Sequence, residues 1–154
     1  MQPSHEYWMD FALKLVRDEK DEVPISALIV KDDKLISQAV NSMESQSDPT
    51  CHAEMMAIKE ACKVIGDWRL NDCTLYTTLE PCCMCTGAII NSRIKKVVFA
   101  AYDKDFVACG SAVNIISALS KENQIEVLGG ISEVKASTIL KEFFKSKRKN
   151  SIQD

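Results

Sequence analysis

Apolar residues recur with two different periods along this chain. Near the N-terminus, Ser4 can cap a helix whose one face collects apolar side chains, namely Trp8, Phe11, Ala12, Leu15 and Val16. Two apolar runs, at 25–30 and 35–40, flank the charged segment 31–34, and this pattern is typical of a β-hairpin. We therefore expect a helix that covers the sheet to which the hairpin belongs.

The remainder of the chain alternates strand and helix patterns. A polar segment at 41–50 ends in Asp-Pro-Thr and predicts a helix from His52 to Ile65 that stops at Gly66. Further strands are predicted at 74–78, 96–101 and 125–128, and further helices at 82–91, 111–119 and from 132 to about 147. This order predicts one α/β sheet with an antiparallel hairpin, parallel crossovers and helices on both faces.

Composition favours one globular domain over residues 1–154, since the chain has 154 residues and 46% hydrophobic content. No stretch approaches the ~18 apolar residues of a membrane span, and the N-terminus lacks the apolar core of a signal peptide. The seven cysteines are an odd number, and three of them lie within 82–85, so a complete disulfide framework is not expected. We expect a cytoplasmic protein.

The net charge of −3 conceals an asymmetry. Residues 1–140 carry 14 Lys and Arg against 20 Asp and Glu, whereas residues 141–154 carry 5 against 2. Cations around Phe143 and Phe144 could hold a phosphate backbone and stack on bases. They would equally suit the last turn of a helix and a solvated tail, so the charge pattern alone leaves both interpretations open.

Two short motifs carry the candidate chemistry: His52-Ala53-Glu54 and Pro81-Cys82-Cys83-Met84-Cys85. One imidazole and two thiolates suit Zn²⁺, and three protein ligands leave the fourth tetrahedral position open to water, as in catalytic zinc sites. Glu54, which follows His52 by two residues, could take a proton from that water. The motifs predict His52, Cys82 and Cys85 as metal ligands and Glu54 as the catalytic residue.

The predicted helices make this convergence feasible. Cys82 and Cys85 are three residues apart and share a helix face. His52 and Glu54 cannot share one, but both could reach a metal placed beyond the helix N-terminus. Cys-x-x-Cys alone would also fit a thioredoxin-like redox site, and Cys51 or Cys83 could reach the metal instead. The combination with His-Ala-Glu favours the zinc site.

Beyond the two motifs, the chain resembles the bacterial tRNA-specific adenosine deaminase family along nearly its whole length. The segments that carry the resemblance are Ser4-His5-Glu6-Tyr7-Trp8-Met9, Glu22-Val23-Pro24, Asp48-Pro49-Thr50, Thr78-Leu79-Glu80-Pro81-Cys82, Ser92-Arg93-Ile94, Gly110-Ser111 and Phe143-Phe144. The resemblance implies a three-layer α/β/α fold of the cytidine deaminase type, with a five-stranded mixed sheet. It also implies one zinc ion per chain and a homodimer.

By the same resemblance, the reaction is hydrolytic deamination of adenosine to inosine at the wobble position of a tRNA anticodon, most simply that of an arginine tRNA. A zinc-activated hydroxide would attack the base, and Glu54 would shuttle the protons. The family positions that contact substrate match Asn41, Asp103 and Phe144. Without the resemblance, these three residues would read equally well as a turn former, a cap and a core side chain.

The chain also departs from the family pattern. Ala100, Asp105 and Val107 stand where the family has Gly, Lys and Gly, and residues 118–125 replace a His-Pro and an Asn-His-Arg element. These departures affect the surface expected to face RNA. Two alternatives therefore stay open: a deaminase of a free base or nucleoside such as cytosine or guanine, and a non-catalytic zinc-binding scaffold.

Overall fold

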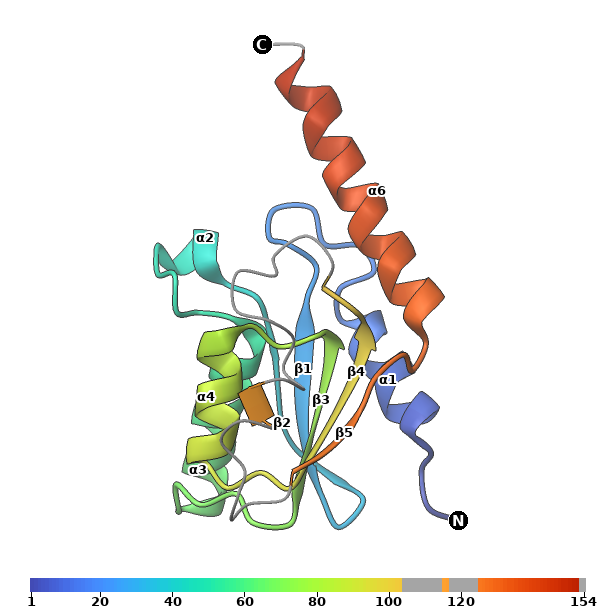
Figure 1. Ribbon diagram of the computed structural model, residues 1–154. Helices are drawn as coiled ribbons and strands as arrows, with labels where there is room; N and C mark the ends of the chain where they lie inside the picture. Colours follow the sequence, from blue (N-terminus) through green and yellow to red (C-terminus); the bar gives the residue numbers. More distant parts are fainter. Residues whose placement is uncertain (104–114, 117–124, 153–154) are drawn as a thin grey trace.

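A mixed sheet of five strands forms the middle layer of the molecule, seen in a computed structural model that describes residues 1–103, 115–116 and 125–152 (Figure 1). The strand order is β2-β1-β3-β4-β5, with bounds β1 Ser26–Lys31, β2 Lys34–Val40, β3 Cys73–Leu79, β4 Lys96–Ala101 and β5 Glu126–Leu128. β1 pairs antiparallel with both β2 and β3, whereas β3, β4 and β5 are parallel. The predicted antiparallel hairpin and parallel crossovers are confirmed.

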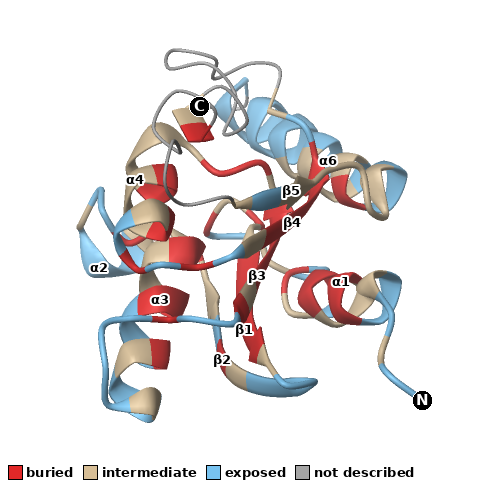
Figure 2. Cartoon of the chain, turned by 60° about the horizontal axis from the view of Figure 1, so that its bottom comes forward, coloured by how far each residue is buried: buried red, intermediate tan, exposed pale blue. Residues whose placement is uncertain are grey.

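Helices cover both faces of this sheet (Figures 1 and 2). α1 (His5–Lys14) and α6 (Glu133–Ser151) pack on one face, and α3 (Ala53–Ile65) and α4 (Cys83–Asn91) lie on the other. The short helix α2 (Met43–Gln46) lies in the polar segment where no helix was predicted. The three-layer α/β/α architecture expected from the sequence is confirmed. None of the helices in the described ranges is long and apolar enough to span a membrane.

Successive side chains of β1 are buried on alternate faces of the sheet. Ala27 and Ile29 join the core beneath α3 and α4, while Leu28 and Val30 join the core beneath α1 and α6. A strand covered on both sides reads as a continuous apolar run, as the sequence does here. The turn to β2 places Asp32 and Asp33 at φ of 50° and 57°, the left-handed values that a two-residue hairpin turn requires.

The N-terminal helix differs in detail from its prediction. The Ser4 hydroxyl accepts a hydrogen bond from the Tyr7 backbone N–H at 3.1 Å, which confirms the cap. Met9 and Leu13 are buried along with Trp8, Ala12 and Val16, whereas the predicted core residues Phe11 and Leu15 are only half-buried. The buried face of the helix is therefore rotated from the predicted one, toward Met9 and Leu13.

Sheet topology brings distant segments of the chain to one edge. The parallel strands β3 and β4 end at the same edge, where Leu79 is the register partner of Ala101. β1 runs antiparallel to β3, so its first residue, Ser26, also lies there, beside the end of β2 at Val40. The carboxyl edge of parallel strands is where α/β proteins bind ligands.

The predicted helix 111–119 falls almost wholly outside the described residues.

Candidate metal centre and substrate pocket

His52 and Cys82 are the N-cap residues of α3 and α4, and the two helices start side by side at this sheet edge. Nδ1 of His52 lies 3.5 Å from Sγ of Cys82 and 3.6 Å from Sγ of Cys85. The three ligand atoms all lie within 4.8 Å of one another. The structure therefore brings together the three residues that the sequence predicts as metal ligands.

Glu54 lies in the first turn of α3, directly beneath this cluster. Its side chain is only 4% exposed, and Oε2 lies 3.6 Å from Sγ of Cys85. The hydroxyl of Thr77, a fully buried residue of β3, lies 3.0 Å from Oε1 of Glu54 and 3.0 Å from the carbonyl oxygen of Leu79. Glu54 is therefore held against the cluster by the middle of the sheet.

Protonation in this cluster follows from hydrogen bonding and burial. A hydrogen bond from Cys85 lowers the pKa of Cys82 to about 4, with a further contribution from His52. That same bond, together with burial, raises the pKa of Cys85. The hydrogen bond to Cys82 raises the pKa of His52, and burial raises the pKa of the Glu54 carboxyl. Without metal the cluster thus retains protons that a metal ion would displace.

The donor set fits zinc. One imidazole nitrogen and two sulfurs converge within metal-ligand reach. Glu54 lies beside them, where its carboxylate could accept a proton instead of serving as a fourth protein ligand. Both helices also direct the positive ends of their dipoles at the sulfurs, which favours thiolate. Cys51 is a buried free thiol, and neither Cys51 nor Cys83 belongs to the cluster.

A pocket of about 990 Å³ opens above the cluster. His52, Glu54 and Cys82 line its floor, and the predicted substrate-binding residues Asn41, Asp103 and Phe144 line its walls. All three predicted contacts therefore lie in one cavity, although they come from separate parts of the chain. This volume is at the upper end of the ~300 to 1,000 Å³ typical of ligand pockets.

Asn41 lines this pocket and has a buried side-chain acceptor without a partner. The side chain is 5% exposed, its Nδ2 donates to the carbonyl oxygen of Val23 at 3.4 Å, and its Oδ1 has no hydrogen-bond partner. A buried polar atom without a partner costs about 1 to 3 kcal/mol. Oδ1 of Asn41 is consequently suited to accept a hydrogen bond from a ligand hydroxyl or amine.

The segment after Asn41 is anchored by Glu22. This buried carboxylate accepts hydrogen bonds from the backbone N–H groups of Glu44 at 3.2 Å and Ser45 at 2.7 Å. It therefore satisfies the N-terminal donors of α2, which no local side chain caps. Glu22, Thr77 and Glu80 were not among the predicted site residues. For Thr77 the sequence did contain a signal, because Thr77 and Thr78 are two adjacent polar residues in a buried strand.

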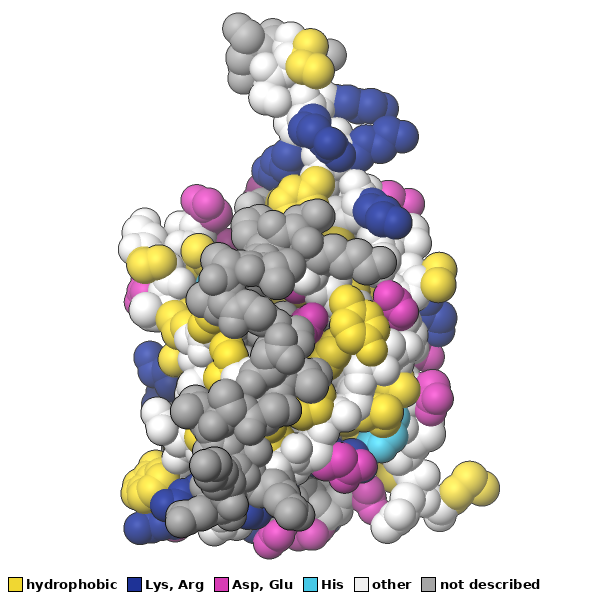
Figure 3. Space-filling model, in the orientation of Figure 1, with side chains coloured by type: hydrophobic (Ala, Val, Ile, Leu, Met, Phe, Trp, Pro, Cys, Tyr) yellow, Lys and Arg dark blue, Asp and Glu magenta, His cyan; other side chains and the backbone are white. Residues whose placement is uncertain are grey.

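Helix α6 supplies the outer wall. Phe144 is 39% exposed and lines the pocket with Lys141, Lys147 and Arg148. Figure 3 shows Lys and Arg side chains gathered on the part of α6 that extends beyond the rest of the molecule. Nζ of Lys147 lies 5.5 Å from the ring centroid of Phe143. The pocket therefore has the metal-ligand cluster at its floor and cations of α6 on its outer wall.

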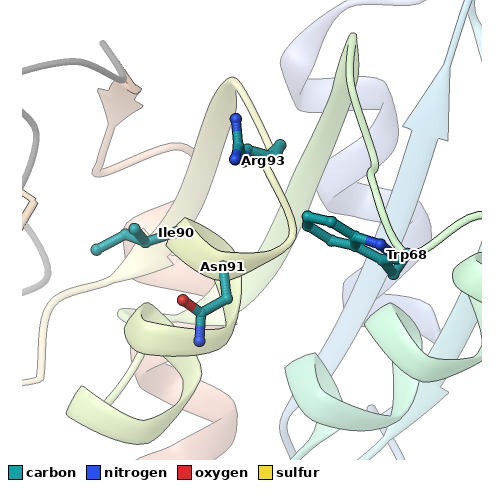
Figure 4. A pocket seen from close by; sticks show the side chains of 4 residues that line it. All are labelled: Trp68, Ile90, Asn91 and Arg93. Atoms are coloured by element: carbon teal, nitrogen blue, oxygen red, sulfur yellow. The ribbon is translucent and has the colours of Figure 1, made fainter.

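A second cavity, of about 540 Å³, is lined by Trp68, Ile90, Asn91 and Arg93 (Figure 4). The guanidinium carbon of Arg93 lies 5.9 Å from the Trp68 ring centroid. No residue of the His52 cluster lines this cavity. Its chemistry is separate from that of the large pocket.

Comparisons with known proteins agree with this geometry. A family model of the cytidine and deoxycytidylate deaminase zinc-binding region matches residues 2–101. The tRNA-specific adenosine deaminase of Aquifex aeolicus is 45% identical over 149 residues, which cover 96% of this chain and 98% of the relative. These matches span both metal-ligand motifs and nearly the whole length of the chain.

Two solved structures have the same fold. One, from a study of A-to-I editing by tRNA deaminases at the wobble position, superposes with a TM-score of 0.79 and 36% identity over 87% of this chain and 99% of that one. Guanine deaminase from Nitrosomonas europaea superposes with a TM-score of 0.80 but only 26% identity, over 93% and 86% of the two chains. Fold alone thus does not separate an RNA substrate from a free base.

Proposed function

This chain belongs to the cytidine and deoxycytidylate deaminase family, and we propose that it is a tRNA-specific adenosine deaminase, a hydrolase that converts adenosine to inosine at the wobble position of an anticodon. The observation that carries the proposal is the placement of Phe144 and three cations on the rim of the pocket that contains Glu54. A free base would need neither, whereas RNA offers phosphates and bases to both.

In this proposal His52, Cys82 and Cys85 hold one zinc ion per chain. When bound, zinc lowers the pKa of water to about 7 and so supplies a nucleophile at neutral pH. Glu54 accepts the proton of the attacking water, then delivers protons to the ring nitrogen and to the departing ammonia. Thr77 orients the carboxylate throughout, because its hydroxyl contacts Oε1 while Oε2 faces Cys85.

Substrate contacts follow from the pocket walls. Asn41 Oδ1 accepts a hydrogen bond from the target nucleoside, Asp103 lines the same pocket, and Phe144 contacts the anticodon loop. The cations of α6 hold the backbone phosphates. An arginine tRNA is the substrate that the family resemblance implies, and residues 105 and 107, which depart from the family pattern, lie outside the described residues.

The proposal extends to one deaminase domain over residues 1–154, a homodimer and a cytoplasmic location, where tRNA is found.

Helix α4 supports the dimer, since it carries no charged residue although Met84, Ala88 and Ile90 are only half-buried. A helix that is apolar on all sides is normally covered. Sedimentation equilibrium of the zinc-loaded protein tests this, and a monomer at micromolar concentration would contradict it.

The decisive experiment compares substrates. An anticodon stem-loop with adenosine at the wobble position is incubated with zinc-loaded protein, in parallel with free adenosine, cytosine and guanine, and inosine or ammonia is measured. We expect inosine in the stem-loop and no reaction of the free compounds. Deamination of guanine or cytosine but not of the stem-loop would establish the free-base alternative. A zinc-loaded protein inactive on all four would establish the scaffold alternative.

A further inference from the structure

Tyr102 is an exposed aromatic residue in the wall of the large pocket. It follows the last residue of β4, Ala101, and its side chain is 45% exposed. Large aromatic side chains usually bury most of their surface, so a half-exposed ring in a concave site is a candidate contact for a ligand. The sequence motifs gave no reason to select it.

The backbone on both sides of Tyr102 is fixed by one residue. The N–H of Glu80 donates to the carbonyl oxygen of Ala101 at 2.9 Å, and the N–H of Asp103 donates to Oε2 of Glu80 at 3.3 Å. Glu80 is itself 5% exposed and lies two residues before Cys82. Tyr102 therefore has a defined position relative to the metal-ligand cluster.

The Tyr102 ring is also supported from behind. Its edge meets the ring of Phe99, with centroids 5.0 Å apart and planes at 88°. A Cβ at Gly129 would lie 2.8 Å from the Tyr102 hydroxyl and 2.4 Å from Cζ of Phe99, so only glycine permits this close approach. The ring is thus preorganised in the lining of the pocket, and binding there would require little side-chain ordering.

The pocket has room for more than the reacting base. Its volume of about 990 Å³ matches the upper limit for drug-sized ligands, and a single nucleobase is smaller than these. Tyr102 and Phe144, on different walls, are the half-exposed rings that line it in the described part of the chain. A base beside the target adenosine would therefore meet an aromatic surface within the same cavity.

We infer that Tyr102 is a stacking platform for a nucleotide adjacent to the adenosine that reacts, an inference that rests on the proposed tRNA function. Stacking on an aromatic ring tolerates any base, because every base has a π-face. Tyr102 then fixes the register of the loop in the pocket, and the ring rather than the hydroxyl is the group that acts.

Binding of anticodon stem-loops tests this in a Glu54→Gln background, in which substrate is not consumed. Tyr102→Leu keeps an apolar side chain without a π-face and should weaken binding about 5- to 140-fold, whereas Tyr102→Phe should bind like the parent. Two further stem-loops each replace one neighbour of the target adenosine by an abasic residue. On the loop that lacks the base stacked on Tyr102, the parent and Tyr102→Leu should bind within about twofold of each other, because the substitution then has no stacking contact to remove.

The abasic loop should also bind the parent more weakly than the intact loop, which tests the platform without any substitution at Tyr102. Equal binding of the intact loop by parent and Tyr102→Leu would overturn the inference. So would an equal loss on intact and abasic loops, because a merely structural Tyr102 predicts that result. If the zinc-loaded wild-type protein fails to form inosine in the intact loop, the tRNA function itself is contradicted, and the inference with it.

Discussion

The hydroxyl of Thr77 lies 3.0 Å from Oε1 of Glu54, although the two residues are 23 positions apart in the chain. Thr77 belongs to β3 and Glu54 to the first turn of α3, and both side chains are buried. The contact joins the middle of the sheet to the residue proposed to move protons. It leaves the other carboxylate oxygen facing the metal-ligand cluster.

Thr77→Val should lower kcat on a stem-loop substrate about 10- to 100-fold with little change in KM, because a hydrogen bond to a charged group is worth about 1.5 to 3 kcal/mol. Thr77 is not among the residues that line the pocket, so substrate binding should persist. Thr77→Ser should restore activity, since it restores the hydroxyl. Steady-state kinetics of both variants check this, and equal activity of Val and Ser variants would refute an orienting role.

Thr86→Val makes the same substitution at another buried threonine and should stabilise the fold. Oγ1 of this fully buried α4 residue has no hydrogen-bond partner. Removing an unsatisfied buried hydroxyl relieves its desolvation penalty, so the free energy of unfolding should rise by up to about 1 kcal/mol. Urea denaturation measures the change. A loss of more than about 1 kcal/mol would show that the hydroxyl is satisfied, for instance by a buried water.

Glu54→Ala should retain zinc and fold but lose deamination. General acid-base groups contribute about 10² to 10⁴-fold in rate, and Glu54 is proposed to act in several proton transfers. Single-turnover kinetics on the stem-loop provide the measurement, with zinc content determined on the same preparation. Activity within about tenfold of the wild type would rule out the proposed proton shuttle.

Cys82→Ala and Cys85→Ala should each abolish stoichiometric zinc binding, because each removes one of three converging ligands. Cys51→Ala is the matched control: Cys51 precedes His52 in sequence and is a buried free thiol, but it is not part of the cluster. Elemental analysis should find about one zinc per chain in the wild type and in Cys51→Ala. Full zinc content in both cluster variants would refute the ligand assignment.

Neutralising Lys145, Lys147, Arg148 and Lys149 should weaken RNA binding and flatten its salt dependence, since fewer counterions are released per complex. All four lie in the exposed second half of α6. Titration of labelled stem-loop at several salt concentrations measures both effects. A solvated helix end without RNA contacts would instead leave affinity and slope unchanged.

Phe144→Ala should weaken RNA binding in a different way from the variant that neutralises the four cations. It removes a stacking surface worth ~1 to 3 kcal/mol per base, so affinity should fall while the salt slope stays the same. Because the Phe144 side chain is 39% exposed, the free energy of unfolding should change little. A steep loss of thermal stability would identify Phe144 as a core residue, the reading that its sequence position alone also allowed.

The zinc-site motifs were readable from the sequence because each is local. His52 and Glu54 belong to one helical turn, and Cys82 and Cys85 to another, so spacing alone constrains their geometry. Thr77 was not identifiable in this way. Its contact with Glu54 depends on how α3 packs on β3, which no local pattern encodes.

The face of α1 and the existence of α2 show the same limit. Apolar residues at 8, 9, 11–13, 15 and 16 surround more than half of α1, so periodicity could not select Met9 and Leu13 over Phe11 and Leu15. The sheet surface makes that selection. Helix α2 owes its start to the carboxylate of Glu22, which lies 22 residues before Glu44. A short polar helix with a distant cap has no local signature.

Helix α6 has two halves with different attachments to the fold. Its first turns are anchored, because Ala136 is buried and Lys135 pairs with Asp10 of α1 at 2.9 Å. From residue 141 onward nearly every side chain is exposed. Backbone amides there should exchange with deuterated solvent through local fraying, at rates independent of global unfolding. Bound RNA would slow that exchange, and part of its affinity would be spent on ordering the helix.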